Sequence, residues 1–216
     1  MEKIRFIIIV VALALNLNSV RANKVAGYII KNNSDTIFGE VKVSCFDIYS
    51  GGIIFYGINL EPFHSILYFK ENNKSRFKSF TPNDISGFGF TYKSINYRFR
   101  TFVIETKSIV ESERKRLRFL SLIYQGEIAV YKDIVRKDNY YMTSFPNKVI
   151  DYYDYYLFDD KHGLTKAVWS KEYKTLIDLF QYYEIDQKFV LQLPAEVRFK
   201  EVKEILYEYE MWKRNN

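Results

Sequence analysis

Short runs rich in tyrosine, phenylalanine, isoleucine and valine recur along this chain, and polar turn-forming residues separate them. The chain has 19 tyrosines and 18 phenylalanines among its 216 residues, and aromatic and β-branched residues favour strands. The first two runs, 26–31 and 36–44, flank a polar turn. In the second run Val41 lies between Glu40 and Lys42, and this alternation predicts one buried and one solvated strand face.

The same pattern predicts about nine or ten strands in all. The turns between them are short, which favours antiparallel neighbours. After the first pair, strands are expected at 66–70, 76–80, 85–92, 95–104, 117–124, 127–132, 152–158 and 164–168. Pro82 must interrupt the sheet because its nitrogen donates no hydrogen bond. The pattern leaves open whether the sheet stays open or curls toward a barrel.

After Trp169 the apolar residues recur at helical spacing. A first helix, with Ser170 as a suitable N-cap, is predicted from Tyr173, Leu176, Ile177, Phe180 and Tyr183. A short second helix is expected over 186–193, before Pro194. A closing helix presents one apolar side, formed by Phe199, Val202, Leu206, Tyr209 and either Met211 or Trp212. The predicted fold class is therefore α+β: a mainly antiparallel sheet followed by two to three C-terminal helices.

The start of the chain has the three zones of a secretory signal peptide. Lys3 and Arg5 precede an apolar run, Phe6–Leu15, and small residues lead up to Ala22. The run has ten residues, whereas a helix that crosses a bilayer needs about 20. We therefore expect cleavage after Ala22 and no stable transmembrane anchor; an uncleaved anchor is the alternative.

This interpretation sets the expected location and domain organisation. Residues 1–22 form the signal peptide, and 23–216 form a single β-rich domain with helices from about residue 170. The expected location is extracytoplasmic: periplasmic, associated with the outer membrane, or secreted. No proline-rich or glycine/serine-rich segment marks a linker inside the mature part.

Several short segments occur in an order that resembles a known group of proteins. They are GYII at 27–30, DTIFGEV at 35–41, TPNDISGFGF at 81–90 and FKEVKEILYEYE at 199–210. Together they resemble uncharacterised exported proteins from bacteria of the phylum Bacteroidota. The resemblance covers most of the mature chain and implies an extracytoplasmic, β-rich domain with a helical tail. That group has no assigned activity, so the resemblance transfers no functional residue.

The sequence contains no recognisable catalytic, metal or nucleotide motif. Cys45 is the only cysteine, so an intramolecular disulfide is excluded. His64 and His162 lack zinc-type spacing and are interpreted as loop and turn residues. Basic and acidic residues are interspersed, with a net charge of +6, whereas nucleic-acid binding usually needs clustered cations. We expect no cofactor, no metal and no nucleic-acid partner.

One dense group of charges offers a candidate binding site. Arg114, Lys115, Arg116 and Arg118 lie within five positions, directly after two glutamates. Basic groups of this kind bind phosphates or anionic glycans. Alternation along a strand would instead make them part of a solvated face, and the sequence does not decide between these two interpretations.

The sequence does not identify a ligand or a reaction. The function that it favours is that of an exported cell-envelope protein without catalytic activity, acting as a binding or interaction module. The partner would be another envelope protein, a lipid or a glycan. The alternatives are an envelope hydrolase with an unrecognised active site and an outer-membrane barrel.

Overall fold

The computed structural model describes residues 23–44, 46–47, 52–53, 58–106, 114–137, 150–167, 176–194 and 201–216. Its sheet strands are β1 (Asn23–Lys31), β2 (Thr36–Val43), β5 (Leu67–Glu71), β6 (Lys78–Phe80), β7 (Ile85–Tyr92), β8 (Ile95–Thr106), β9 (Arg114–Tyr124), β10 (Ala129–Lys137), β11 (Ile150–Asp159) and β12 (Gly163–Lys166). A separate pair is formed by β3 (Phe46–Asp47) and β4 (Gly52–Ile53). The helices are η1 (Glu61–His64), α2 (Leu176–Tyr182), α3 (Gln187–Val190) and α4 (Val202–Asn215). The expected signal peptide and the N-cap Ser170 lie outside the described residues.

The ten strands form one antiparallel sheet in the order β12-β11-β10-β9-β8-β7-β1-β2-β5-β6. The sheet is open, with β12 and β6 at its edges, so it does not close into a barrel. The predicted α+β fold class is confirmed. The predicted hairpins are present, and the first one pairs Tyr28 with Phe38 and Ala26 with Glu40.

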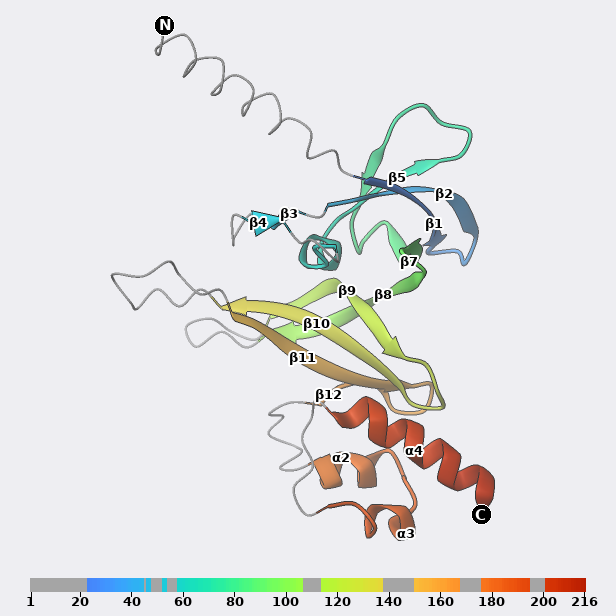
Figure 1. The fold of residues 1–216 in the computed structure, drawn as a ribbon, viewed down its shortest axis with the longest axis vertical. Coiled ribbons are helices and arrows are strands. Elements are labelled where there is room, and N and C mark those ends of the chain that lie inside the picture. The colour runs from blue at the N-terminus through green and yellow to red at the C-terminus, as the bar shows by residue number, and fades with distance from the viewer. Residues whose placement is uncertain are drawn as a thin grey trace, which may run out of the picture.

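The sheet divides between β9 and β10 (Figure 1). The strands β8 and β9 pair along their length, from Phe99↔Ser121 to Thr106↔Arg114. In contrast, β9 and β10 pair only between Val130↔Tyr124 and Lys132↔Ser121. Beyond Lys132, β10 continues beside β11 alone. We call β1, β2 and β5–β9 the N-terminal half sheet and β10–β12 the C-terminal half sheet.

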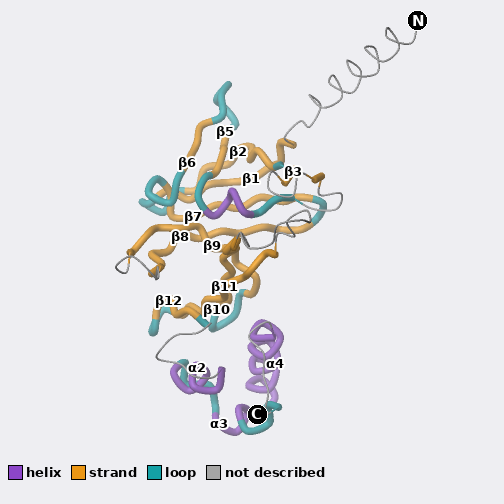
Figure 2. The backbone as a smooth tube through the Cα atoms, turned by 90° about the vertical axis from the view of Figure 1, so that its left-hand side faces the viewer, coloured by secondary structure: helices purple, strands orange, loops and turns teal. Residues whose placement is uncertain are grey.

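The two half sheets and the helices form successive layers (Figures 1 and 2). The core of the N-terminal half sheet is rich in phenylalanine, and Phe63 of η1 packs there on Phe88, Phe90 and Phe99. A smaller core joins β8 and β9 to β10 and β11 and contains Phe102, Ile104, Leu120, Tyr131 and Tyr156. The helices cover the remaining face of the C-terminal half sheet.

The amphipathic closing helix packs as its sequence pattern predicts. Val202 and Leu206 of α4 are buried against Leu157 of β11. The sequence left Met211 and Trp212 as alternatives; Trp212 packs against this core, whereas Met211 remains 40% exposed. Burial of this apolar side stabilises the helix.

Candidate functional site

One side of β1, β2 and β5 exposes aromatic and basic side chains. Because side chains alternate along a strand, Ile29, Val41 and Phe69 enter the core, while their sequence neighbours face solvent. This solvated side, which we call the outer face, is formed by Lys24, Tyr28, Phe38, Glu40, Lys42, Tyr68 and Lys70, with Phe77 from the segment before β6. Phe38 is 64% exposed and Tyr68 is 46% exposed.

An aromatic pair occupies one end of the outer face. Tyr28 and Phe38 are directly opposite each other in the β1–β2 register, with ring centroids 6.2 Å apart. The Tyr28 ring lies over Gly89 of β7, where a Cβ atom would be only 2.6 Å from the Tyr28 hydroxyl oxygen. The glycine thus lets the ring lie close to the neighbouring strand.

Lysines and further rings occupy the other end. The Lys42 ammonium lies 5.9 Å from the centre of the Tyr68 ring. Lys24 and Lys70 lie 5.8 and 5.7 Å from the centre of the Phe77 ring. These separations suit cation–π attraction, which places positive charge beside the exposed rings.

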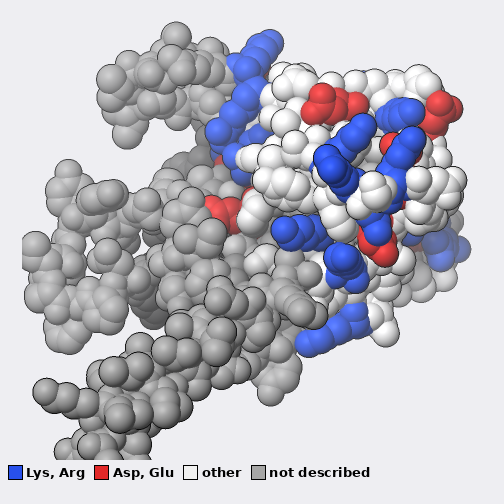
Figure 3. Space-filling view, turned by 90° about the horizontal axis from the view of Figure 1, so that it is seen from above, with Lys and Arg blue, Asp and Glu red and all other residues white. Residues whose placement is uncertain are grey.

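The outer face is positively charged overall. Lys70 pairs with Glu40 at 2.7 Å, and the hydrogen bond from Lys70 holds the pKa of Glu40 below its ordinary value. Among the described residues, no carboxylate lies within ion-pair distance of Lys24 or Lys42. Seen from above, basic side chains predominate over acidic ones on the described part of this surface (Figure 3).

The structure divides the basic group predicted from the sequence. Arg114 begins β9, and Lys115 lies on the opposite side of that strand from Arg116 and Arg118. Lys115 lies 3.4 Å from Glu105 in an exposed ion pair. Burial and the neighbouring charge of Arg118 lower the pKa of Arg116. Arg116 and Arg118 are thus close together, but Arg118 points into the protein rather than toward solvent.

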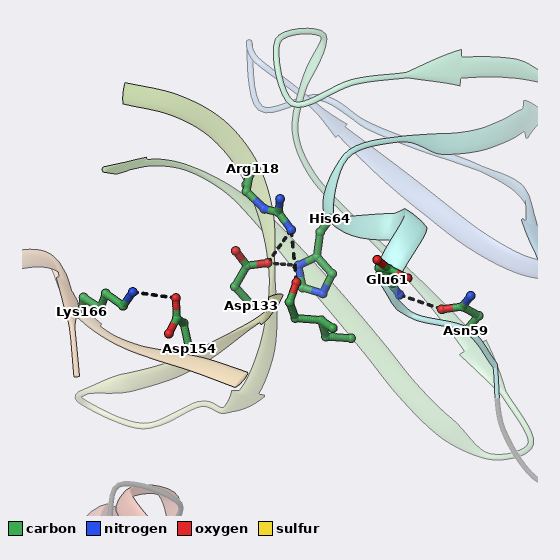
Figure 4. A network of polar contacts seen from close by, with 8 residues as sticks. Asn59, Glu61, His64, Arg118, Asp133, Asp154 and Lys166 are labelled. Carbon is green, nitrogen blue, oxygen red and sulfur yellow. Dashed lines mark hydrogen bonds and ion pairs between the residues drawn. The ribbon is translucent and has the colours of Figure 1, made fainter. Parts of the chain in front are cut away.

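Arg118 belongs to a buried polar network at the point where the half sheets separate (Figure 4). Its Nη2 atom donates a hydrogen bond of 2.8 Å to Oδ1 of Asp133 in β10. Nδ1 of His64, at the end of η1, lies 3.0 Å from the same oxygen. His64 is fully buried and Asp133 is 1% exposed. The network therefore joins β9, β10 and η1 inside the protein.

A carboxylate beside an imidazole is also an arrangement used in proton transfer. Here neither group reaches the surface, because the exposed fractions of His64 and Asp133 are 0% and 1%. The His64 ring packs edge-on against Phe99, with centroids 5.9 Å apart. In this arrangement the pair has no access to a substrate, and its evident effect is to connect the elements that surround it.

His162 lies in the turn between β11 and β12, as the sequence predicts. Its backbone amide and its Nδ1 atom lie 2.5 and 2.8 Å from the two carboxylate oxygens of Asp159. Burial opposes ionisation of Asp159, but the hydrogen bonds from His162 outweigh this effect and lower its pKa. The turn is therefore held by an ionised carboxylate.

This arrangement predicts a pH-dependent contribution to stability. A carboxylate whose pKa is lowered on folding stabilises the protein above its unfolded pKa of about 3.9, and this stabilisation is lost as the pH falls through the folded pKa. We expect Asp159→Asn to reduce the free energy of unfolding at pH 5, and the difference from wild type to disappear toward pH 2. Urea denaturation across this range measures it; a pH-independent difference would contradict the role of ionised Asp159.

The outer face was missed at the sequence level because its lysines are far apart in the chain. They come together only through the β1–β2 and β2–β5 pairings, which place Lys24 opposite Lys42 and Glu40 opposite Lys70. One local signal was present: Phe38 occupies a position on the polar side of its strand. A single exposed aromatic residue is common on protein surfaces, whereas a group of them indicates a contact surface, and only the strand pairing places Tyr28 and Tyr68 near Phe38.

In the described part of the chain, no helix is both long enough and apolar enough to span a membrane. Comparison with known proteins returned no matching family model, no matching curated protein and no matching solved structure.

Proposed function

We propose that this chain is an exported, non-catalytic binding module of the cell envelope, and that it contacts its ligand through the outer face. The observation that carries the proposal is the exposure of Phe38 and Tyr68 beside Lys24 and Lys42, which form no ion pair with a carboxylate among the described residues. The proposed export depends on the signal-peptide pattern of residues 1–22.

The two sides of β1, β2 and β5 differ in a way that supports this proposal. One side packs into a phenylalanine-rich core, to which these strands contribute Ile29, Val41 and Phe69. The other side keeps large rings in water although their burial would be favourable. Side chains that combine aromatic surface with positive charge are typical of binding surfaces.

An envelope-binding experiment tests the proposal. The exported protein is incubated with washed envelope fragments of the producing bacterium, and the bound fraction is measured by sedimentation. We expect wild type to sediment with the fragments and Lys24→Gln/Lys42→Gln to bind about tenfold more weakly, a loss of about 1.4 kcal/mol. Lys188→Gln/Lys203→Gln removes the same charge from exposed helix positions and should bind as wild type does.

Two results would refute the proposal. Wild-type protein that stays in the supernatant at all concentrations would exclude an envelope-binding role. If Lys24→Gln/Lys42→Gln bound the fragments as tightly as the control Lys188→Gln/Lys203→Gln does, the lysines of the outer face would make no contact with the envelope. N-terminal sequencing of the exported protein provides a separate check on export, since we expect the mature chain to begin at Asn23.

A further inference from the structure

We infer that the ligand of the outer face is an acidic polysaccharide, with sugar rings stacked on the aromatic side chains and acidic groups paired with Lys24 and Lys42. This inference rests on the proposed function and names the chemical class that the face would bind. It follows from the arrangement of rings and charges, from the central carboxylate of Glu40, and from the shape of the surface.

The outer face offers both kinds of contact along one line. Tyr28 and Lys24 are four positions apart in β1, which corresponds to about 13 Å along a strand. Phe38 and Lys42 have the same spacing on β2 and lie opposite them. A chain of sugar rings that runs along these strands would meet the aromatic pair first and the lysines next.

The aromatic rings are suited to stacking rather than to enclosing a ligand. Phe38 and Tyr68 are exposed on a sheet surface, and Tyr28 lies close over the backbone of Gly89. Exposed rings on a sheet present flat apolar surface to the C–H faces of a sugar. The ammonium groups of Lys24 and Lys42 stay near such rings at 5.8 and 5.9 Å, so an acidic substituent can be bound while its ring is stacked.

Glu40 favours a sugar over a nucleic acid. Single-stranded nucleic acids also bind to surfaces of aromatic rings and cations. However, Glu40 lies on β2 in the middle of the outer face, opposite Ala26 of β1 and Lys70 of β5, and its side chain is 38% exposed. A carboxylate accepts hydrogen bonds, and a polysaccharide offers many hydroxyl donors between its acidic groups, whereas the sugar-phosphate backbone of DNA offers none.

The same face is poorly suited to insertion into a membrane. Interfacial binding buries an apolar surface about 5–10 Å deep at the headgroup boundary. Here the rings of Tyr68 and Phe77 lie beside lysine ammonium groups, and the Glu40–Lys70 ion pair lies among them. Insertion of the rings would carry these charges into the apolar layer, at a large desolvation cost.

Calorimetric titration with defined polymers tests the inference. The probes are polygalacturonate and chondroitin sulfate as acidic polysaccharides, dextran as a neutral one, oligo-deoxythymidine, and phosphatidylglycerol vesicles. We expect wild type to bind at least one acidic polysaccharide more tightly than any other probe, and dextran not to bind. Phe38→Ala/Tyr68→Ala should weaken that binding about tenfold, as should Lys24→Gln/Lys42→Gln.

Matched variants separate a loss of contact from a loss of folding. Tyr207→Ala removes an aromatic ring of α4 that is 56% exposed, and with Lys188→Gln/Lys203→Gln it should leave binding unchanged. The substituted outer-face residues are exposed, so all these variants should unfold within a few degrees of wild type. A variant with a lower unfolding temperature is replaced by single substitutions at the same positions.

The outcomes distinguish this inference from the proposed function. Tighter binding to oligo-deoxythymidine or to vesicles would overturn the inference and identify that ligand class instead. An effect of the lysine variant without an effect of the aromatic variant would show simple charge attraction and also overturn it. If no acidic polysaccharide binds while envelope sedimentation persists, only the inference fails; if sedimentation is also absent, the proposed function fails with it.

Discussion

Replacing Asp133 with alanine is expected to lower the free energy of unfolding by about 3–5 kcal/mol, the usual cost of removing one partner from a buried ion pair. The carboxylate is 1% exposed and contacts both Arg118 and His64. Its removal leaves the guanidinium, on a side chain 14% exposed, without its acidic partner in the interior. Urea denaturation followed by circular dichroism measures the loss.

The neighbouring strand supplies a matched control. Asp154 lies directly opposite Asp133 in the β10–β11 register and pairs with Lys166 at 2.6 Å, but both side chains are partly exposed. Asp154→Ala should therefore cost about 1 kcal/mol or less. If Asp133→Ala fails to fold, Asp133→Asn retains an acceptor for Arg118 and should show an intermediate loss. Equal costs for the substitutions at 133 and 154 would contradict a special role of the buried network.

Replacing Leu206 with alanine is expected to lower the free energy of unfolding by about 2–5 kcal/mol, because the side chain is 2% exposed and its removal leaves a cavity. Leu206 packs with Leu157 of the sheet and Leu179 of α2. If 23–216 is one cooperative domain, as the sequence predicts, the sheet and the helices should unfold in a single shared transition. Tryptophan fluorescence and far-ultraviolet circular dichroism, recorded together, test this coincidence.

Met211 provides the control for the same helix. It is 40% exposed on α4, so Met211→Ala should change stability by less than about 1 kcal/mol. If Leu206→Ala instead produced a separate early transition with the sheet signal unchanged, the helices would constitute an independent unit. The prediction of a single domain would then be wrong.

The strands and helices that are determined by neighbouring residues were predictable from the sequence. The strand expected at 85–92 coincides with β7. The second helix, expected over 186–193, is the shorter α3, and the side chain of Asp186 caps it by accepting a hydrogen bond from the Lys188 amide. Alternation and turn residues are properties of neighbouring positions, so they are visible in a single sequence. The buried side of α4 is also visible in the sequence. The choice between Trp212 and Met211 is not, because it depends on the packing of Trp212 against Phe189 and Tyr209.

Two features depend on contacts between residues far apart in the chain: the outer face, and the division of the sheet between β9 and β10. His64 follows Pro62 and Phe63 and resembles a loop residue in sequence, yet η1 brings it to Asp133, 69 positions later in the chain. The basic neighbours of Arg118 in the sequence predict a solvent-facing basic group, whereas its partner, Asp133, lies on the next strand. Such contacts depend on register and on the path of connections, which hydrophobic periodicity does not specify.

The two outermost strands of the sheet affect how the protein can pair with other molecules. The outermost strands β6 and β12 contain only three and four residues, so each has only a short row of amide and carbonyl groups on its outer side. Long, flat edge strands can pair with strands of other molecules and so start aggregation. Outermost strands of this length offer only a short template for such pairing.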